Sequence, residues 1–349
     1  MTEFVTDPAS LTPEWLSGVL GERVSSVTVS EVTGGVIART VRVRLGYTGA
    51  APGAPRSLVA KFPAEAELPR MLAKGAGLYT REVLFYRELA PRVGMRVPRC
   101  HFGRVDEAGE RFALLLEDVT DATMHDQDEA WAREDVLLAL GQLALLHGAH
   151  WDDSRLASLG WLNSLSGERL EAWEQLFRVA WQDFTARAEV ELDPGLFALG
   201  ERFCAAGFDS WTEGFQGPRS LVHADFHTGN LLFRTREDGA REVVTVDWQL
   251  VTYASPLIDV AYLLGRMPTA VRRAGERDLV RAYHAALAAD YPWDRCWEDY
   301  QRWVWYGVVS ALIAVLGTPM SAKEAALYCD KVTRYLTQAA DHDSVRFVS

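Results

Sequence analysis

Residues 221–233 and 243–248 contain the side-chain types that a phosphoryl-transfer reaction needs. Asp225 lies two residues after His223 and five before Asn230. Kinase-type catalytic loops use this spacing to hold one carboxylate for the acceptor hydroxyl and one amide for a metal ion. We therefore predict that Asp225 is the catalytic carboxylate and that His223 braces its loop by hydrogen bonds. Asn230 and Asp247, the latter at the end of the next apolar run, are predicted to bind Mg²⁺.

The combination of these residues is more specific than any one of them. An isolated aspartate or asparagine in a turn usually caps the local backbone. Phosphoryl transfer spreads negative charge over oxygen atoms, so positioned cations and donors supply most of the catalysis. His227, inside the same loop, could contact phosphate or acceptor, or simply pack.

A lysine and a glutamate upstream complete the set. Lys61 ends the apolar strand predicted over 57–62, where a kinase lysine contacts the α and β phosphates. In the kinase arrangement, a glutamate on the following helix steers that lysine. The candidate here is Glu82, which lies 21 residues after Lys61, in the first turns of the helix predicted over 78–89. Glu88 is the competitor and is predicted to be solvated. If only a lysine and a glutamate were present, the simpler interpretation of either glutamate would be an exposed charge on the helix.

Two further stretches are candidate nucleotide contacts. Gly34 and Gly35 lie between the strands predicted over 24–32 and 36–47, where backbone N–H groups can approach phosphates. Two glycines also form an ordinary hairpin turn, and a full G-x-G-x-x-G pattern is absent. The buried strand predicted over 112–119 suits a connection between lobes, where the backbone around Glu117 and Val119 could bind adenine. Glu117 and Asp118 could equally be hinge surface, ribose contacts or helix-start charges.

The composition limits the class of protein. The chain has 349 residues, 48% hydrophobic and 24% charged, which fits a globular enzyme with two lobes. Its net charge of -12 argues against nucleic acid or an anionic membrane as partner and favours a cationic or neutral acceptor. Four scattered cysteines predict neither a zinc site nor a disulfide framework, so a reducing cytoplasm fits.

No membrane segment or signal peptide is predicted. Acidic residues precede the first apolar run. The longest apolar stretch, 303–317, is shorter than the roughly 20 residues that span a bilayer, so a buried helix is predicted there.

The second half of the chain is predicted to be mostly helical. A buried helix is predicted over 134–151, and its His147 and His150 are interpreted as packed or capping residues rather than metal ligands. The segment 152–219 is helical and rich in aromatic residues, most of them core and some able to line an acceptor pocket. Core packing is also predicted for the aromatic residues at 297–306.

The motifs at 223–230 and 246–249 resemble those of the aminoglycoside phosphotransferase and choline kinase superfamily. Further stretches resemble bacterial members of its ecdysteroid-kinase-like branch, namely 11–16, 58–62, 82–86, 115–119, 143–147 and 256–261. The resemblance implies an α+β, two-lobed protein-kinase-like fold. Its nucleotide-binding lobe, an antiparallel sheet with a helix, would cover 1–118, and a mostly helical catalytic and acceptor-binding lobe would cover 119–349.

The same resemblance implies an activity and a supporting residue. It implies ATP and Mg²⁺ as cofactors and transfer of the γ-phosphoryl group to a small-molecule hydroxyl. It also implies that Asp259 supports the catalytic loop, although a capped helix start would explain that residue too. The loop at 33–38 departs from the expected pattern, because bulky residues replace a more open glycine pattern.

Three classes of function follow. The first is an ATP-dependent O-phosphotransferase acting on an antibiotic or other natural product, a steroid-like alcohol or an amino alcohol. The second is a catalytically silent kinase-like module that binds a nucleotide or a partner, which the intact Asp225, Asn230 and Asp247 disfavour. A protein kinase is disfavoured because no A-P-E activation segment follows Asp247.

Overall fold

A computed structural model describes residues 4–32, 37–124, 131–162, 167–187, 190–213, 215–317 and 320–348. Contacts between residues group the chain into two units. The first comprises Met1–Thr123 and Leu232–Val251, and the second comprises Met124–Leu231 and Thr252–Ser349. The lobe boundary between residues 118 and 119 remains a prediction. The segment 232–251, which the sequence placed in the second lobe, groups with the first unit.

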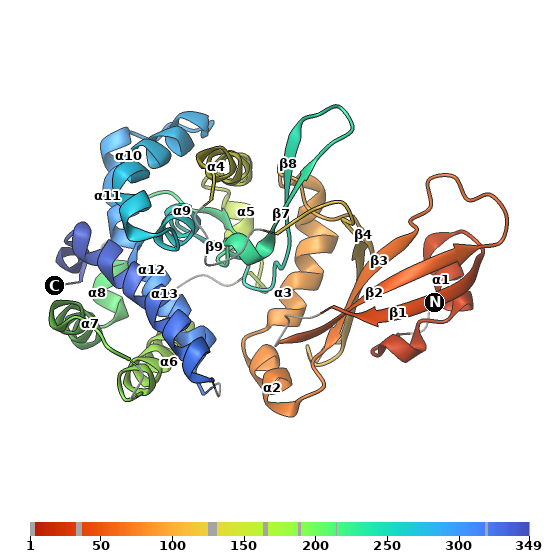
Figure 1. Ribbon diagram of the computed structural model, residues 1–349, viewed down its shortest axis with the longest axis horizontal. Helices are drawn as coiled ribbons and strands as arrows, with labels where there is room; N and C mark the ends of the chain where they lie inside the picture. Colours follow the sequence, from red (N-terminus) through yellow and green to blue (C-terminus); the bar gives the residue numbers. More distant parts are fainter. Residues whose placement is uncertain are drawn as a thin grey trace. The chain divides into compact units, whose positions relative to one another are not determined.

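The first unit is built on an antiparallel sheet. Its five strands pair in the order β1-β2-β3-β5-β4 (Figure 1). They are β1 (Val24–Glu31), β2 (Ala38–Tyr47), β3 (Ser57–Pro63), β4 (Cys100–Val105) and β5 (Phe112–Glu117). The antiparallel sheet predicted for this part of the chain is therefore confirmed.

The two faces of β3 have different surroundings. Ala60 and Phe62 are buried and pack in a core that includes Trp15 of α1 (Pro13–Leu20). Successive strand residues point to opposite faces, so Lys61 points away from that core. The helix α1 begins after Thr12, whose side chain caps it by accepting a hydrogen bond from the Trp15 N–H at 3.2 Å.

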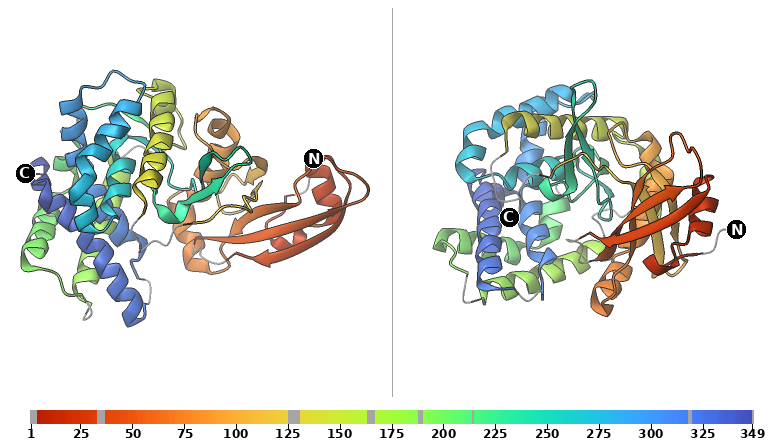
Figure 2. Two further views of the ribbon diagram at one scale, coloured as in Figure 1. Left: turned by 45° about the horizontal axis from the view of Figure 1, so that its top comes forward. Right: turned by 45° about the vertical axis from the view of Figure 1, so that its right-hand side comes forward.

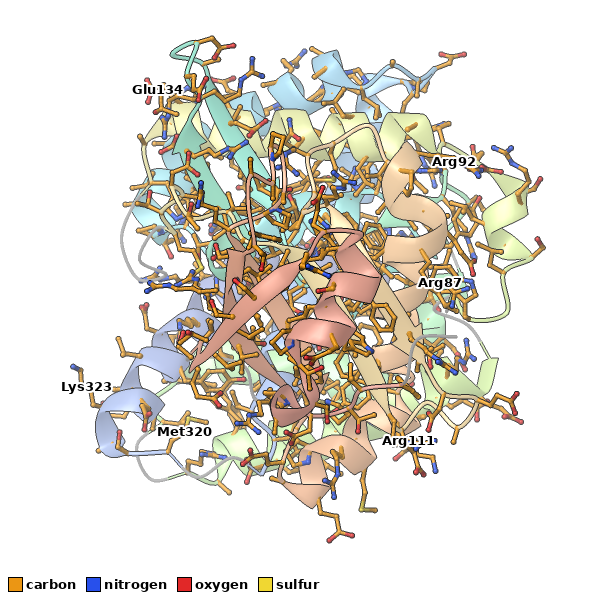
Figure 3. All side chains as sticks on the ribbon, turned by 90° about the vertical axis from the view of Figure 1, so that its right-hand side faces the viewer. Arg87, Arg92, Arg111, Glu134, Met320 and Lys323 are labelled. Atoms are coloured by element: carbon orange, nitrogen blue, oxygen red, sulfur yellow. The ribbon has the colours of Figure 1, made fainter. Side chains whose placement is uncertain are left out.

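Helices follow β3 in the first unit. They are α2 (Glu67–Gly75), α3 (Leu78–Leu84), the π-helical turn η2 (Phe85–Leu89) and the short η3 (Ala90–Arg92), with η1 (Pro8–Ser10) near the N-terminus. Glu82 on α3 is only 1% exposed. Arg87, labelled in Figure 3, and Glu88 lie on the exposed side of η2, so Glu88 is solvated as predicted.

A hairpin of β7 (Leu231–Thr235) and β8 (Arg241–Thr245) carries the chain to Asp247. It joins the first unit through an antiparallel bridge between Thr123 and Phe233, whose backbone groups exchange two hydrogen bonds of 2.8 Å. This hairpin explains why the segment 232–251 groups with residues that are more than 100 positions earlier in the sequence.

The second unit is mostly helical, as predicted (Figure 2). Its elements are α4 (Arg133–Ala149), α5 (Ser154–Ala157), α6 (Gly167–Thr185), α7 (Pro194–Ala206), α8 (Phe208–Glu213), β6 (Ser220–Val222), η4 (Thr228–Asn230), β9 (Thr252–Ala254), α9 (Leu257–Gly265), α10 (Thr269–Ala286), α11 (Trp293–Trp303), α12 (Trp305–Ala314), α13 (Ala322–Asp341) and η5 (Ser344–Phe347). The strands β6 and β9 pair antiparallel and flank the segment that carries Asp225.

Aromatic side chains fill the core of this unit. Tyr300, Trp305 and Tyr306 are buried, which confirms core packing for these members of the aromatic group at 297–306. The single helix predicted over 303–317 is wrong in its bounds, because Val304 separates α11 from α12 and the second helix ends at Ala314. Within the described residues, no helix combines the length and apolar character needed to cross a membrane.

Two helical glycines of this unit give a test of core packing. A Cβ atom at Gly200 would lie 2.1 Å from the Trp181 ring, whereas one at Gly141 would meet nothing within 4 Å. We expect Gly200→Ala to lower the free energy of unfolding by about 1–3 kcal/mol through overpacking. The matched Gly141→Ala should raise it by about 0.5–1 kcal/mol, because alanine loses less backbone entropy. Urea unfolding measures both, and equal effects of the two variants would contradict this packing.

Candidate active site

Lys61 lies between two carboxylates of the first unit. Its Nζ donates hydrogen bonds to Glu82 Oε1 at 2.6 Å and to Asp247 Oδ1 at 2.8 Å. The Lys61 side chain is 12% exposed and that of Glu82 is 2% exposed. Three residues that are distant in the sequence, and that were predicted for the site, therefore meet at the Lys61 ammonium group.

Electrostatics keep this ammonium group charged. Burial acts to lower the pKa of Lys61, but Asp247 and Glu82 outweigh it, so the pKa lies above its ordinary value. Burial raises the pKa of the Glu82 carboxyl, and Lys61 opposes that shift. The result is a fixed positive charge that suits phosphate oxygens.

Asp247 has an unusual backbone conformation. Its φ is 65°, in the left-handed region that few non-glycine residues adopt. The next residue anchors it, because the buried Trp248 ring stacks on Phe85 of η2 with centroids 3.8 Å apart. Backbone strain of this kind costs about 1–3 kcal/mol and is concentrated at functional sites. Neither Trp248 nor Phe85 was among the residues predicted for the site.

In the second unit, Asp225 and Asn230 contact each other across their loop. The Asn230 Nδ2 donates to the Asp225 backbone oxygen at 2.9 Å and to its Oδ2 at 3.0 Å. His227 Nε2 lies 3.4 Å from Asp225 Oδ1. The His223 Nδ1 accepts a hydrogen bond from the Asp225 N–H at 3.2 Å, so this histidine contacts the loop in the way expected of a brace.

The charge state of Asp225 follows from these contacts. Burial acts to raise the pKa of its carboxyl, but His227, His223 and the hydrogen bond from Asn230 outweigh burial and lower it. Asp225 is therefore ionised at neutral pH. A carboxylate this acidic is better suited to orient a hydroxyl group than to remove its proton before phosphoryl transfer. Orientation of the hydroxyl group is what a loose transition state requires.

Asp259 holds the backbone just before Asp225. Its Oδ2 accepts a hydrogen bond from the His223 N–H and its Oδ1 one from the Ala224 N–H, each at 2.7 Å. Ala224 has a φ of 64° and the Asp259 side chain is fully buried. The two N–H groups thus fix a strained bend, and Asp259 lies where the family resemblance implied a supporting residue.

Three further side chains support this bend. His147 Nε2 lies 3.3 Å from Asp259 Oδ2, and its Nδ1 lies 2.8 Å from the Tyr283 hydroxyl. The Tyr306 hydroxyl donates to the Ala224 backbone oxygen. His147 is therefore a packed residue, as interpreted from the sequence. Its contact with Asp259 could not be predicted, because the two residues are 112 positions apart in the sequence.

Asp259 offers a test of this support. Asparagine has only one acceptor oxygen for two buried N–H groups, so Asp259→Asn should lower the free energy of unfolding by about 2–4 kcal/mol. Tyr306→Phe loses one hydrogen bond to the same bend and should cost about 1 kcal/mol. Urea unfolding followed by near-UV circular dichroism measures both. A smaller effect for Asp259→Asn than for Tyr306→Phe would contradict the role given to Asp259.

Asn230 in the second unit and Asp247 in the first each offer an oxygen atom of the kind that Mg²⁺ binds. Because the Asn230 amide nitrogen faces Asp225, its carbonyl oxygen is the atom left for a cation. One Asp247 oxygen contacts Lys61, and the side chain is 30% exposed. Mg²⁺ takes few protein oxygens and completes its shell with phosphate and water. Among the described residues, no three His, Cys, Asp or Glu side chains lie close enough together to hold a metal ion by themselves.

The remaining predicted nucleotide contacts are the two glycines at 34 and 35 and the end of β5 with the residues that follow it. Gly34 and Gly35 lie outside the described residues. Glu117, at the end of β5, pairs with Arg96 and accepts a hydrogen bond from the Arg99 N–H at 3.0 Å. These contacts occupy its carboxylate, so a nucleotide contact there would use the backbone, as it would at Val119.

Comparisons with known proteins show which fold and which family the chain has. The chain has a two-lobed, protein-kinase-like α+β fold of the kind that small-molecule phosphotransferases share. It belongs to the ecdysteroid kinase-like family, whose model matches residues 35–291. The predicted superfamily is therefore confirmed.

Solved structures show the same fold at low sequence identity. A Ralstonia eutropha JMP134 protein assigned as an aminoglycoside phosphotransferase has a TM-score of 0.60 at 16% identity, covering 97% of this chain and 99% of that one. A microcompartment-associated aminopropanol kinase has a TM-score of 0.56 at 14% identity, with 95% and 98% covered. The GDP complex of an aminoglycoside 2′-phosphotransferase-IIIa variant has 0.57 at 16% identity, with 92% and 93% covered. No curated protein sequence matches the chain significantly.

Proposed function

We propose that the chain is an ATP-dependent O-phosphotransferase that phosphorylates a hydroxyl group of a small molecule. The observation that carries the proposal is the placement of the Lys61 ammonium between Glu82 and Asp247. A lysine held in this way presents a fixed positive charge to phosphate groups. The pairing of Asp225 with Asn230 in the second unit supplies the remaining residue types of a phosphoryl-transfer site.

Each residue has a role in the proposed reaction. Asp225 orients the acceptor hydroxyl and takes up its proton as the new bond to the γ-phosphorus forms and the bond to the ADP oxygen breaks. Asn230 and Asp247 hold Mg²⁺, which when bound neutralises charge on the phosphate oxygens. Lys61, steered by Glu82, binds the phosphates, and His223 braces the loop. The backbones at Gly34, Gly35, Glu117 and Val119 complete the nucleotide site.

The acceptor is a hydroxylated small molecule, and the candidates are an antibiotic or other natural product, a steroid-like alcohol or an amino alcohol. Aminoglycoside and aminopropanol kinases among the structural relatives support a small-molecule acceptor in general. We also propose a cytoplasmic location, which the four free cysteines support.

A coupled ADP-release screen tests the proposal. The protein, ATP and Mg²⁺ are combined with aminoglycosides, macrolides, sterols, sugars and amino alcohols, and each is repeated with GTP. Acceptor-dependent ADP or GDP release that EDTA abolishes is the expected result. Nucleotide binding without turnover across the whole panel would instead favour the catalytically silent binding module.

A further inference from the structure

The buried Tyr79 joins the ends of two strands of the first unit. It lies on α3, which packs beside the sheet (Figure 1), and it is only 2% exposed. Its hydroxyl donates a hydrogen bond to the Ile37 backbone oxygen at 2.7 Å and accepts one from the Ala64 N–H at 3.2 Å. Ile37 directly precedes β2, and Ala64 directly follows β3. One hydroxyl group therefore bridges the two strands where their own pairing stops.

Pro63 explains why a side chain is needed at this place. The pairing of β2 with β3 ends with Ala38 opposite Pro63, and proline has no N–H group to donate to a neighbouring strand. Ile37 and Ala64 form the next position outward and are joined through the tyrosine hydroxyl. Because a hydroxyl can donate and accept at once, it satisfies both backbone groups and sets the spacing between the two strand ends.

Ring packing fixes the position of this hydroxyl. The Tyr79 ring stacks on the buried Phe112 of β5, with centroids 4.3 Å apart and an angle of 23° between the planes. Burial raises the pKa of the Tyr79 hydroxyl, so it stays protonated at neutral pH and remains a donor. Phenylalanine at this position would keep the stacked ring and remove only the hydroxyl.

The same face of α3 holds Lys61. Tyr79 and Glu82 are spaced i, i+3, and residues at this spacing are neighbours on a helix surface. Glu82 binds the Lys61 ammonium at 2.6 Å, and Tyr79 binds the backbone three residues after Lys61. Helix α3 is therefore attached to the chain of β3 at two points. A shift at the Ala64 attachment would displace the strand that carries Lys61.

We propose that Tyr79 is a positioning residue for the phosphate groups of the nucleotide. This inference rests on the function proposed above and assigns a further residue to it. Tyr79 acts through its hydroxyl, which sets where the strand of Lys61 lies relative to the end of β2. Without the hydroxyl, the Ala64 N–H and the Ile37 oxygen would either move together or remain unpaired. Misplacement of a binding group by about 1 Å can cost on the order of 10²-fold.

Two ligands distinguish phosphate positioning from general support of the fold. AMP-PNP, a non-hydrolysable analogue of ATP, carries the phosphate groups, whereas adenosine lacks them. Calorimetry with Mg²⁺ measures the affinity of the full chain for each, so the readout does not need turnover. Tyr79→Phe should weaken AMP-PNP binding about tenfold and leave adenosine binding within about twofold of the wild type. A merely structural role would change both affinities alike.

Tyr47→Phe is the matched control. Tyr47 ends β2, and its hydroxyl donates to the Pro55 backbone oxygen at 2.7 Å, at the opposite end of the strand from Ile37. Both variants lose a hydrogen bond from a tyrosine to a backbone oxygen, so both should unfold at lower urea concentrations than the wild type. Only Tyr79→Phe should change the affinity for AMP-PNP.

A second substitution keeps the test decisive if Tyr79→Phe does not fold. Incorporation of 4-aminophenylalanine at position 79 keeps a donor for the Ile37 oxygen and the stacked ring. This variant should bind AMP-PNP within about threefold of the wild type. A tenfold loss in this variant would contradict the role given to the donor.

Three outcomes would overturn the inference. They are wild-type affinity for AMP-PNP in Tyr79→Phe, an equal loss of adenosine affinity in that variant, and an equal loss of AMP-PNP affinity in Tyr47→Phe. A wild type that binds neither ligand would remove the proposed function and the inference with it. Nucleotide binding that depends on Tyr79, together with no turnover in the ADP-release screen, would keep the positioning role and remove only the proposed activity.

Discussion

Replacing Asp225 with asparagine is expected to lower acceptor-dependent ADP release by about 10³-fold while nucleotide binding stays near the wild-type level. Asparagine keeps the size of the side chain but removes the charge that orients the acceptor hydroxyl and takes its proton. Lys61 and Asp247, which are expected to contact the nucleotide phosphates and the metal, and Glu82, which holds Lys61, are unchanged in this variant. Coupled ADP release measures turnover, and calorimetry measures nucleotide affinity.

The control for this variant is Asp209→Asn. Asp209 is an exposed acidic residue of α8 in the same unit, so its variant makes the same change in net charge away from the loop. It should retain wild-type turnover. If Asp225→Asn also retained turnover with an acceptor identified in the screen, the catalytic role of Asp225 would have to be abandoned.

Lys61→Met is expected to be both inactive and unstable. Removing the ammonium leaves the Glu82 carboxylate buried without its partner, which should lower the free energy of unfolding by about 3–5 kcal/mol. Because the pKa of Lys61 lies above its ordinary value, this contribution is fully present below about pH 10.4 and is lost as the pH rises through the folded-state pKa. Urea unfolding at pH 7 measures the loss.

A second substitution separates stability from activity. Lys61→Met with Glu82→Gln removes the unpaired buried charge, so most of the stability should return while ADP release stays absent. Lys74→Met serves as the control, because Lys74 and its partner Glu110 have half-exposed side chains. Such a surface pair should contribute less than about 1 kcal/mol. A double variant no more stable than Lys61→Met would show that the unpaired Glu82 charge is not the cause of the instability.

Local patterns predicted the elements of the first unit and the loop that holds Asp225. Alternation along β3 places Lys61 on the face opposite to that of the buried Phe62. The hydrogen bonds between Asp225 and Asn230 span only five residues, so sequence spacing constrains them. These predictions succeed because the interactions that decide them lie within one turn or one strand.

Packing between distant residues was not predictable in the same way. Phe85 and Trp248 stack although more than 160 residues separate them, and no periodicity links a π-helical turn to a loop after β8. The link of His147 to Tyr283 is equally non-local. Val304 has helical backbone angles and no proline or glycine signal, so the division between α11 and α12 leaves no mark in the sequence.

The bend at Ala224 has a consequence for the order of folding. Alanine has no intrinsic preference for a φ of 64°, so the chain adopts this conformation only when Asp259 and Tyr306 bind the backbone around it. Asp259 lies 35 residues after Ala224, and Tyr306 lies 82 residues after it. A nascent or partly folded chain therefore lacks the loop geometry until α9 and α12 have docked. In the proposed phosphotransferase, the loop that carries Asp225 would therefore form late in folding.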